Sequence, residues 1–184
     1  FYSCYGLKSV TIPNSVTSIG YEAFKYCSSL TSITIPNSVT SIRSGAFYGC
    51  TSLEKIEIPP SVKTIGNGQA ETFGYCTKLK EVHISDIKAW SSIIFDNPYS
   101  NPLLYAKKLY LNGELLTELV IPDSIKEIKN YAFYNFDGLT SITIPNSVTR
   151  IGLSAFSGCS SLTSVIFNAE NCKTMGSSST PVFN

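Results

Sequence analysis

Cysteine is the residue type in this chain best suited to nucleophilic, redox or metal chemistry, and six copies are present. Five of them each lie three residues before a leucine, and Phe136 occupies the same place in another copy of that pattern. A position that accepts either cysteine or phenylalanine is an apolar core position. The remaining one, Cys172, aligns with Val16 when NCKTMG is matched to SVTSIG. The sequence therefore predicts six core cysteines: Cys4, Cys27, Cys50, Cys76, Cys159 and Cys172.

Disulfide formation and metal binding are the alternatives for these cysteines. Cysteines stacked in neighbouring structural repeats can reach the Cα separation of about 4.4 to 6.8 Å that a disulfide requires. Side chains that project in parallel are poorly oriented for that bond, so a reduced ladder is favoured over a disulfide. Metal binding is less favoured still, because no two cysteines have the spacing of a zinc-binding pair.

His83 is the only histidine, so a Ser-His-Asp or Cys-His site would depend on it. The segment EVHIS places it at an outward strand position, and Glu81 and Asp86 are the nearest acids in sequence. No serine lies in a nucleophile-elbow context, and the Gly66-Asn67-Gly68 segment lacks a nucleotide-binding pattern. We therefore expect a solvated surface histidine, no catalytic residue, no metal ligand and no cofactor.

Composition and charge argue against nucleic-acid binding and membrane insertion. The chain has 184 residues, 43% of them hydrophobic, and a formal net charge of +1. Its lysines and arginines are scattered, so the basic surface needed for phosphate-backbone binding is missing and nucleic acid is not expected as a partner. No apolar run approaches the roughly 20 residues of a transmembrane helix, and membrane insertion is not expected.

Internal repetition dominates the sequence. Residues 30–42 read LTSITIPNSVTSI and residues 139–151 read LTSITIPNSVTRI, so Ser41 against Arg150 is the single difference. Anchor leucines are separated by 23, 23, 26, 37, 23 and 23 residues. The period is therefore 23, with one short and one long insertion. The anchors are Leu7, Leu30, Leu53, Leu79, Leu116, Leu139 and Leu162.

Each unit reads approximately as a short strand, a turn and a second extended segment. Ile33 and Ile35 alternate with polar residues, which is the pattern of a strand with one buried face. Pro36 ends that strand because it cannot donate a ladder hydrogen bond. GAFYGC has the composition of a short helical turn. Stacked units bury a continuous core, so we predict a right-handed repeat solenoid of short parallel β-strands in which residues 1–184 form one domain of seven to eight coils.

The unit L-x-x-I-x-I-P-x-S-V-x-x-I-G-x-x-A-F-x-x-C resembles the BspA-like, treponemal-type leucine-rich repeat. The resemblance implies a secreted or cell-surface protein that adheres to host proteins or to other cells. The register of the repeats also indicates a fragment of a longer array, because Phe1 enters in the middle of a unit and Pro181-Val182-Phe183 lies where Ala-Phe closes earlier units.

Residues 85–115 break the period. Ser85 or Asp86 is positioned to cap a short helix ending at Trp90, Asn101-Pro102 to start a brief turn, and Asn112-Gly113 to form a two-residue hairpin turn. The resemblance extends to this insertion, since ISD, AW, SNPL and YLNGEL elements also occur in the family. Its aromatic residues either fill a small core or form a binding patch: Trp90, Phe95, Tyr99, Tyr105 and Tyr110.

Outward strand positions are small and hydroxylated at both ends and charged in the middle. A partner protein or glycan would therefore contact the central coils, whereas the alternative is a polar face that keeps the sheet soluble. The tentative ligand set is Lys55, Glu57, Glu81, His83, Glu118, Trp90, Tyr99 and Tyr110. A non-catalytic protein-interaction scaffold is favoured, and an accessory glycan- or substrate-targeting module of a larger enzyme is the alternative.

Overall fold

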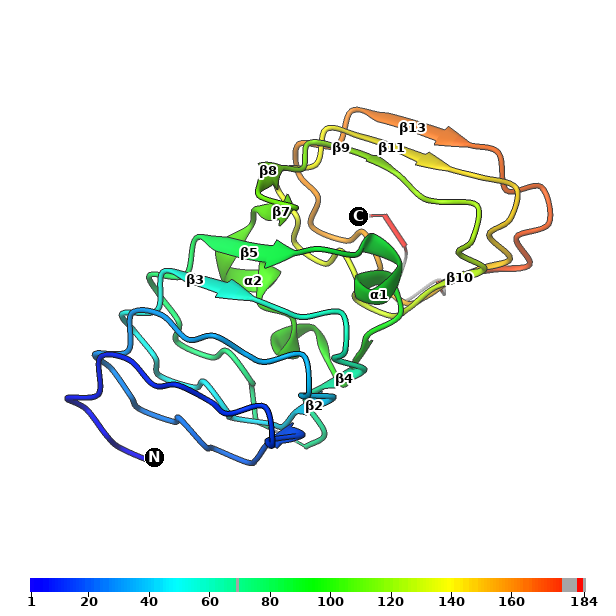
Figure 1. Ribbon diagram of the computed structural model, residues 1–184. Helices are drawn as coiled ribbons and strands as arrows, with labels where there is room; N and C mark the ends of the chain where they lie inside the picture. The colour runs from blue at the N-terminus through cyan, green and yellow to red at the C-terminus, as the bar shows by residue number, and fades with distance from the viewer. Residues whose placement is uncertain (69, 177–181, 184) are drawn as a thin grey trace.

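The computed structural model describes residues 1–68, 70–176 and 182–183 and is a parallel β-solenoid (Figure 1). One column of strands carries the I-x-I segment of each coil: β3 (Lys55–Glu57), β5 (Glu81–Ile84), β7 (Leu109–Leu111), β9 (Glu118–Val120), β11 (Ser141–Ile144) and β13 (Ser164–Phe167). Thr11 and Thr34 form an isolated parallel bridge in the first two coils. The solenoid with a period of about 23 residues is therefore confirmed.

The second column carries the S-x-I segment. Its strands are β1 (Ser18–Ile19), β2 (Ser41–Ile42), β4 (Thr64–Ile65), β6 (Ile94–Phe95), β10 (Glu127–Ile128), β12 (Arg150–Ile151) and β14 (Thr174–Met175). Each pairs in parallel with the strand of the next coil, except where the columns are interrupted between β6 and β10. Ile151 pairs with Met175, which confirms the predicted match of NCKTMG to SVTSIG, since that match sets Met175 at the isoleucine position.

Between the two columns, proline and serine make a turn that also connects the coils. Val39 donates its N–H to the carbonyl of Pro36 at 3.0 Å, which closes the turn. Ser38 donates its hydroxyl to the carbonyl of Val16 in the preceding coil at 2.7 Å. The serine of the repeated phrase therefore satisfies a backbone acceptor that the short strands leave free.

The opposite edge of each coil is the column of F-x-x-C segments. These segments were expected to be short helical turns, but the structure has successive four-residue turns, such as the one closed by the Cys50 N–H and the Phe47 carbonyl at 3.1 Å. Helix is interrupted there because residues two before and two after most of these phenylalanines adopt positive φ, as at Gly45 (68°) and Gly49 (72°) around Phe47.

Phenylalanine rings stack along this edge inside the core. The rings of Phe24 and Phe47 have centroids 5.6 Å apart and lie 8° from parallel, and Phe1 and Phe73 continue the stack. A second stack contains Phe133, Phe156 and Phe183. Phe183 and Val182 thus occupy the predicted Ala-Phe position, while Pro181 lies outside the described residues.

The insertion at residues 85–115 forms an additional coil of the stack. Asp86 caps α1 (Ile87–Ser91), β6 pairs with β4, η1 (Pro98–Ser100) and α2 (Leu103–Ala106) replace the turn segment, and β7 pairs with β5. The predicted Asn112-Gly113 turn then joins β7 to the antiparallel β8 (Glu114–Leu115). The hairpin ends the first sheet as β3-β5-β7-β8, and β9-β11-β13 starts anew.

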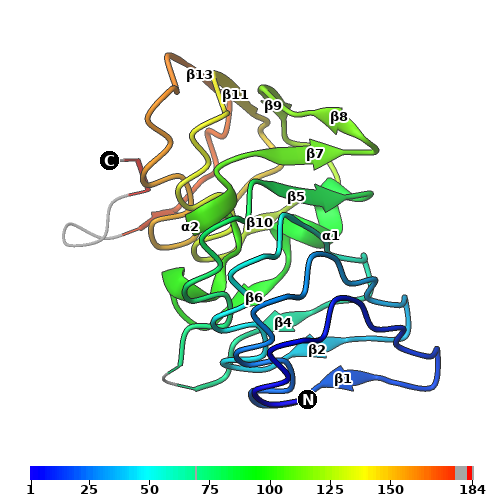
Figure 2. The same cartoon turned by 90° about the vertical axis from the view of Figure 1, so that its left-hand side faces the viewer.

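We call the coils up to the β7–β8 hairpin and the coils from β9 onward the two halves of the stack. Helices α1 and α2 lie between these halves (Figures 1 and 2). The strand ladders are interrupted between the insertion and the next coil, and side chains of the insertion hydrogen-bond to that coil instead. The buried Trp90 indole donates to the carbonyl of Ala132 at 2.8 Å, and the buried Asn101 amide donates to the carbonyl of Tyr131 at 2.7 Å. From the other side, the Asn135 amide donates to the carbonyl of Leu104 at 2.9 Å.

Candidate binding surface

The central strands place five of the tentative ligand residues on one continuous surface, which we call the strand-face patch: Lys55, Glu57, Glu81, His83 and Tyr110. Alternation along each strand directs these side chains outward, since Ile56 and Val82 between them are buried. Parallel pairing of β3, β5 and β7 sets Lys55 beside Glu81 and aligns Glu57, His83 and Tyr110 in one row.

His83 is held in a defined orientation within this patch. Its Nε2 lies 2.8 Å from Oε2 of Glu81, and its ring stacks on Tyr110 with centroids 4.6 Å apart and planes 8° from parallel. In the part of the chain that the structure describes, Glu81 is the one hydrogen-bond partner of the imidazole. Asp86, the other nearby acid, accepts from the backbone of Lys88 and Ala89 instead. His83, Glu81 and Tyr110 supply polar and aromatic contact area. No nucleophile is aligned with the His83 imidazole in the described residues.

Three tentative ligand residues lie away from the patch. Glu118 is exposed on β9, which belongs to a different sheet from β3, β5 and β7. Tyr99 is half exposed on η1 and lines a cavity with Gly68, Asp96 and Asn97. Trp90 is 1% exposed and its indole N–H is bonded to the backbone. We therefore remove Trp90 from the ligand set, because a buried ring cannot contact a partner; in the insertion it is a core residue.

The cysteines are unpaired thiols, and four of them are buried. The thiols of Cys27, Cys50, Cys76 and Cys159 each donate to the carbonyl of the phenylalanine one coil earlier, at 3.1 to 3.3 Å. Burial raises the pKa of Cys50 to about 12 and that of Cys159 likewise. Cys4 and Cys172 pack against the core from the terminal coils but are partly exposed, so the prediction that all six are core residues is too broad.

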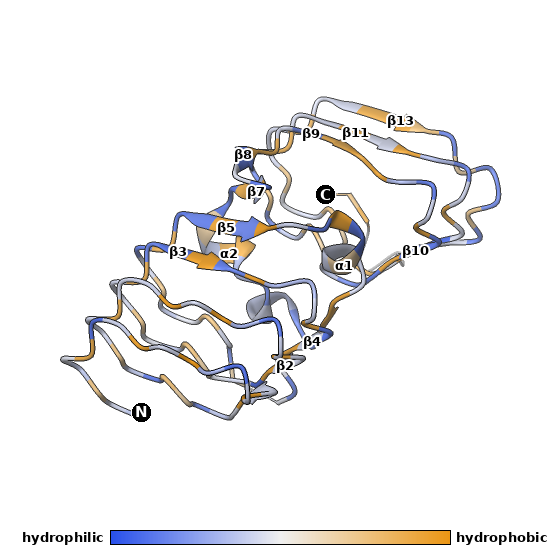
Figure 3. Ribbon diagram, in the orientation of Figure 1, coloured by the Kyte–Doolittle hydropathy of each residue, from blue (hydrophilic) through white to orange (hydrophobic). Residues whose placement is uncertain are grey.

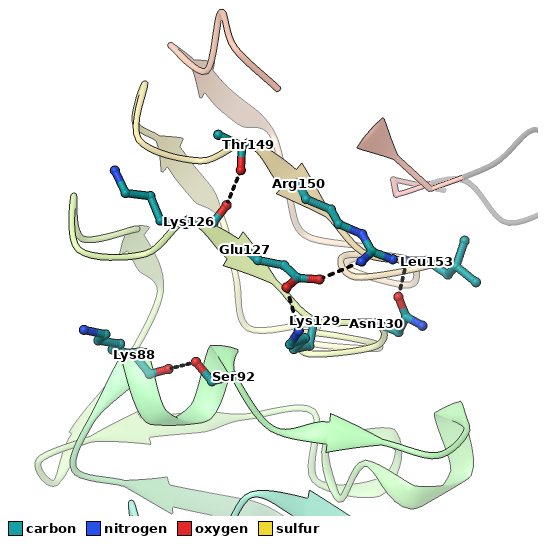
Figure 4. Close-up of polar contacts among 9 residues, drawn as sticks. All are labelled: Lys88, Ser92, Lys126, Glu127, Lys129, Asn130, Thr149, Arg150 and Leu153. Atoms are coloured by element: carbon teal, nitrogen blue, oxygen red, sulfur yellow. Dashed lines mark hydrogen bonds and ion pairs between the residues drawn. The ribbon is translucent and has the colours of Figure 1, made fainter. Parts of the chain in front are cut away.

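Ser41 and Arg150 occupy the one position that differs between the two copies of the repeated phrase, and each matches its partner in the preceding coil. Ser41 pairs in register with Ser18, and their hydroxyls are 2.9 Å apart. Arg150 pairs in the same register with Glu127, and the two side chains form an ion pair at 3.0 Å (Figure 4). Lys129 completes the cluster at 2.6 Å from Glu127. An exposed ion pair of this kind contributes about 0 to 1 kcal/mol to stability. The serine pair and the arginine–glutamate pair each connect one coil to the next.

Tyrosines form a second surface that we did not single out from the sequence. Tyr2, Tyr26, Tyr48 and Tyr75 follow one another along four consecutive coils, with ring centroids 6.0, 5.6 and 5.2 Å apart, and we call them the tyrosine row. Lys25 lies 5.3 to 5.8 Å from the centroids of the first three rings. The sequence contained a signal for this row, because a tyrosine follows the phenylalanine by one or two residues in each of the first four F-x-x-C segments.

Two residues of this row hold a backbone conformation that tyrosine rarely adopts. Tyr26 has a φ of 61° and Tyr75 a φ of 58°, in the left-handed region. The same position holds Gly49 and Asn135 in other coils, which tolerate that region better. For a bulky side chain the cost is roughly 1 to 2 kcal/mol per residue. Repeat architecture alone therefore favours Gly or Asn at this position.

Neither a metal cluster nor a membrane span is found in the described residues. No three His, Cys, Asp or Glu side chains gather there in a metal-binding arrangement. The helices within the same ranges are all too short or too polar to cross a bilayer.

The sequence matches the model of the BspA-type leucine-rich repeat region, in six copies, over residues 1–102 and 105–180. No curated protein matches the chain. Among solved structures, a leucine rich repeat protein of T. pallidum is 26% identical with a TM-score of 0.54, over 89% of this chain and 68% of that one.

Two further similar structures give lower scores. A leucine rich cell surface protein of Faecalibacterium prausnitzii is 25% identical, with a TM-score of 0.38 over 91% of this chain and 56% of that one. The pneumococcal vaccine antigen PcpA is 22% identical, with a TM-score of 0.42 over 92% and 54%. Because the family model covers nearly every coil that stacks in the structure, the chain belongs to the BspA-type leucine-rich repeat family.

Proposed function

We propose that this protein is a non-catalytic adhesion scaffold that binds a host or neighbouring-cell protein through the strand-face patch. Membership of the repeat family supports the coarser role of a protein-interaction scaffold. The observation that carries the finer proposal is the row Glu57, His83 and Tyr110, which three paired strands align on one exposed surface beside Lys55 and Glu81. A secreted or cell-surface location belongs to the same proposal and follows the expectation for the family.

The chemistry of the patch fits a protein partner with mixed charge. Aromatic residues and charged groups held in fixed positions are typical of recognition hot spots. Tyr110 is held against His83, and His83 is held by Glu81 at 2.8 Å, so little side-chain entropy is lost when a partner binds. Acidic and basic groups lie side by side, which favours selection of a complementary partner over general attraction to a charged polymer.

The proposal includes residues 1–184 as a single domain. Buried apolar residues form one cluster that runs through both halves of the stack. The hydrogen bonds of Trp90, Asn101 and Asn135 cross the interruption between the halves. Lys107 and Asp137 add an ion pair at 2.8 Å across the same joint.

Binding of the purified protein to a panel of host extracellular-matrix and cell-surface proteins, measured by surface plasmon resonance, tests the proposal. A Lys55→Ala, Glu57→Ala, His83→Ala triple variant should weaken each specific interaction at least about tenfold, because it removes the centre of the patch. The matched control is Asp123→Ala, Lys126→Ala, Thr149→Ala, which deletes one acidic, one basic and one neutral side chain at exposed positions elsewhere. Equal affinities for the two triple variants would place the site off the strand face.

A further inference from the structure

The second column of strands has a gap between β6 and β10. Within the described residues, β6 pairs with β4 alone and β10 with β12 alone, so each strand has one free edge facing the gap. A free edge presents N–H and C=O groups that can pair with another chain. The gap contains a cavity of about 220 Å³, which we call the joint slot, lined by Ile94, Phe95, Glu127, Lys129, Asn130 and Arg150.

One backbone acceptor at the joint slot has lost its usual partner. Elsewhere in the column, the carbonyl at the isoleucine position accepts a hydrogen bond from the next coil, as that of Ile42 does from the N–H of Gly66 at 2.9 Å. At the joint slot, the N–H of Lys129 donates instead to the carbonyl of Ser91 at 3.0 Å. The carbonyl of Phe95, which occupies the isoleucine position of β6, is therefore left without its ladder bond.

One backbone donor is left on the other edge. The residue before each short strand normally donates to the preceding coil, as Lys63 does to the carbonyl of Thr40 at 2.8 Å. The N–H of Lys126 makes no such bond in the part of the chain that the structure describes. An extended peptide carries both a donor and an acceptor in every residue and can pair with both edges. A helix cannot do so, because its own backbone groups are bonded internally.

Positive charge gathers around the joint slot. Glu127 holds Lys129 at 2.6 Å and Arg150 at 3.0 Å, so both cations are fixed beside the cavity. Lys88 and Lys126 are exposed and have no ion-pair partner in the described ranges. Figure 4 shows Lys88 and Lys126 on one side of Glu127 and Arg150 on the other. Four cations thus surround one carboxylate, which favours a partner with acidic side chains.

Ile94 adds an apolar contact to this basic surface. It is 56% exposed and occupies the outward row that holds Ser18, Ser41 and Thr64 in the preceding coils. Side chains directly opposite on neighbouring strands pack against each other, and β-branched residues do so well. The ligand that fits is therefore an extended segment that combines acidic residues with a β-branched apolar residue.

We infer that the joint slot binds an extended acidic peptide of a partner protein, which adds a strand between β6 and β10. Its backbone pairs with the carbonyl of Phe95 and the N–H of Lys126, while its acidic side chains lie beside Lys88 and Arg150. The slot is in the second column of strands and the strand-face patch is in the first, so the chain carries two separate recognition surfaces.

A fluorescein-labelled peptide Glu-Glu-Val-Thr-Val-Glu-Glu, blocked at both ends, is the probe, and fluorescence anisotropy measures its binding to the purified protein. Binding should be saturable and should weaken as salt is raised, because the charges are exposed. Hydrogen exchange at the amide of Lys126 should slow in the complex, because a strand then covers it. The same peptide with N-methyl groups on alternate residues should bind at least about tenfold more weakly, because it cannot donate to one edge.

Charge deletion at the joint slot supplies the matched variants. Lys88→Ala combined with Lys126→Ala removes two exposed lysines and should weaken peptide binding roughly 3- to 30-fold. The control is Lys8→Ala combined with Lys80→Ala, which removes the same charge at exposed positions away from the slot and should leave binding unchanged. The strand-face triple variant should also bind the peptide as the wild type does, so failure of either proposed surface is recognised separately.

Four results would each overturn the inference. These are no saturable binding of the acidic peptide, equal binding of its N-methylated form, equal affinities for the two double-lysine variants, and binding of heparin in place of the peptide. The last result would show a surface for sulfated polymers instead of an acceptor for a strand.

Discussion

Asn101 makes several of the hydrogen bonds at the connection between the two halves of the solenoid. It is fully buried between the insertion and the following coil. Its amide donates to the carbonyl of Tyr131 at 2.7 Å and to that of Ala132 at 3.3 Å, and its Oδ1 accepts from the N–H of Leu103 at 2.9 Å. Asn101→Ala removes all three hydrogen bonds while the buried backbone groups stay in place.

The expected cost follows from the partners that would be left. The carbonyl of Ala132 keeps the indole of Trp90 at 2.8 Å, so it stays satisfied. The carbonyl of Tyr131 and the N–H of Leu103 lose these bonds to Asn101. Each buried group left unpaired costs about 1 to 3 kcal/mol, so the loss of two should lower the free energy of unfolding by about 2 to 6 kcal/mol. A native domain has about 5 to 15 kcal/mol in total, which makes this a severe change.

Urea unfolding followed by two probes measures the effect. Trp90 is the only tryptophan and lies at the joint, so its fluorescence reports this region, whereas far-ultraviolet circular dichroism reports the whole stack. Asn171→Ala is the control, because Asn171 is exposed and makes one long contact of 3.4 Å with Asn146; its effect should stay within about 0.5 kcal/mol. If Asn101→Ala costs no more than Asn171→Ala, the joint is not held by these hydrogen bonds.

Three further changes have defined outcomes. Burial raises the pKa of Cys50 and Cys159 from 9.0 to about 12, so these thiols ionise at a lower pH in the unfolded chain than in the folded protein. The free energy of unfolding should therefore be constant below about pH 9 and then fall toward pH 12 by roughly 1.4 kcal/mol per pH unit for each thiol. Urea titrations at pH 8 and 10.5 measure that slope, and a flat profile would contradict it. Phe47→Ala should lower the free energy of unfolding by about 3 to 5 kcal/mol, since it opens the middle of the ring stack, and intact stability would refute the stack as a core element. Gly113→Ala should cost about 1 kcal/mol through backbone strain alone, because φ is 87° and a Cβ would touch nothing; thermal unfolding shows whether the hairpin tolerates it.

Several features of the stack were predictable because they depend on local periodicity. The alternation of Ile33 and Ile35 with polar residues indicated a strand with one buried face, and the spacing of the cysteines indicated their stacked positions. The Asn112-Gly113 hairpin was predictable for the same reason, since its turn requires positive φ at two adjacent residues. The sequence did not predict that each buried cysteine thiol donates to a phenylalanine carbonyl of the preceding coil, because that bond joins segments 26 or 29 residues apart.

The insertion and the surfaces depended on contacts that sequence reasoning could not place. Trp90 was one candidate for a binding patch, and it proved to be buried in the core, where its N–H donates to a carbonyl of a later coil. Glu118 resembles Glu81 in the aligned sequence, yet the hairpin of β7 and β8 separates their sheets. Exposed apolar residues on β13 appear in orange in Figure 3 and likewise reflect position in the stack rather than local pattern.

The sequence by itself determined the coil: its length, its two short extended segments, its proline turn and the apolar residues that face inward. These follow from the period of 23 and from alternation within a few residues. Tertiary structure alone decided which coils are neighbours on the surface, and therefore which side chains act together. His83 and Tyr110 stack, Arg150 meets Glu127, and Tyr26 extends over Gly49 because one coil packs on the next, at distances along the chain that no local pattern reports.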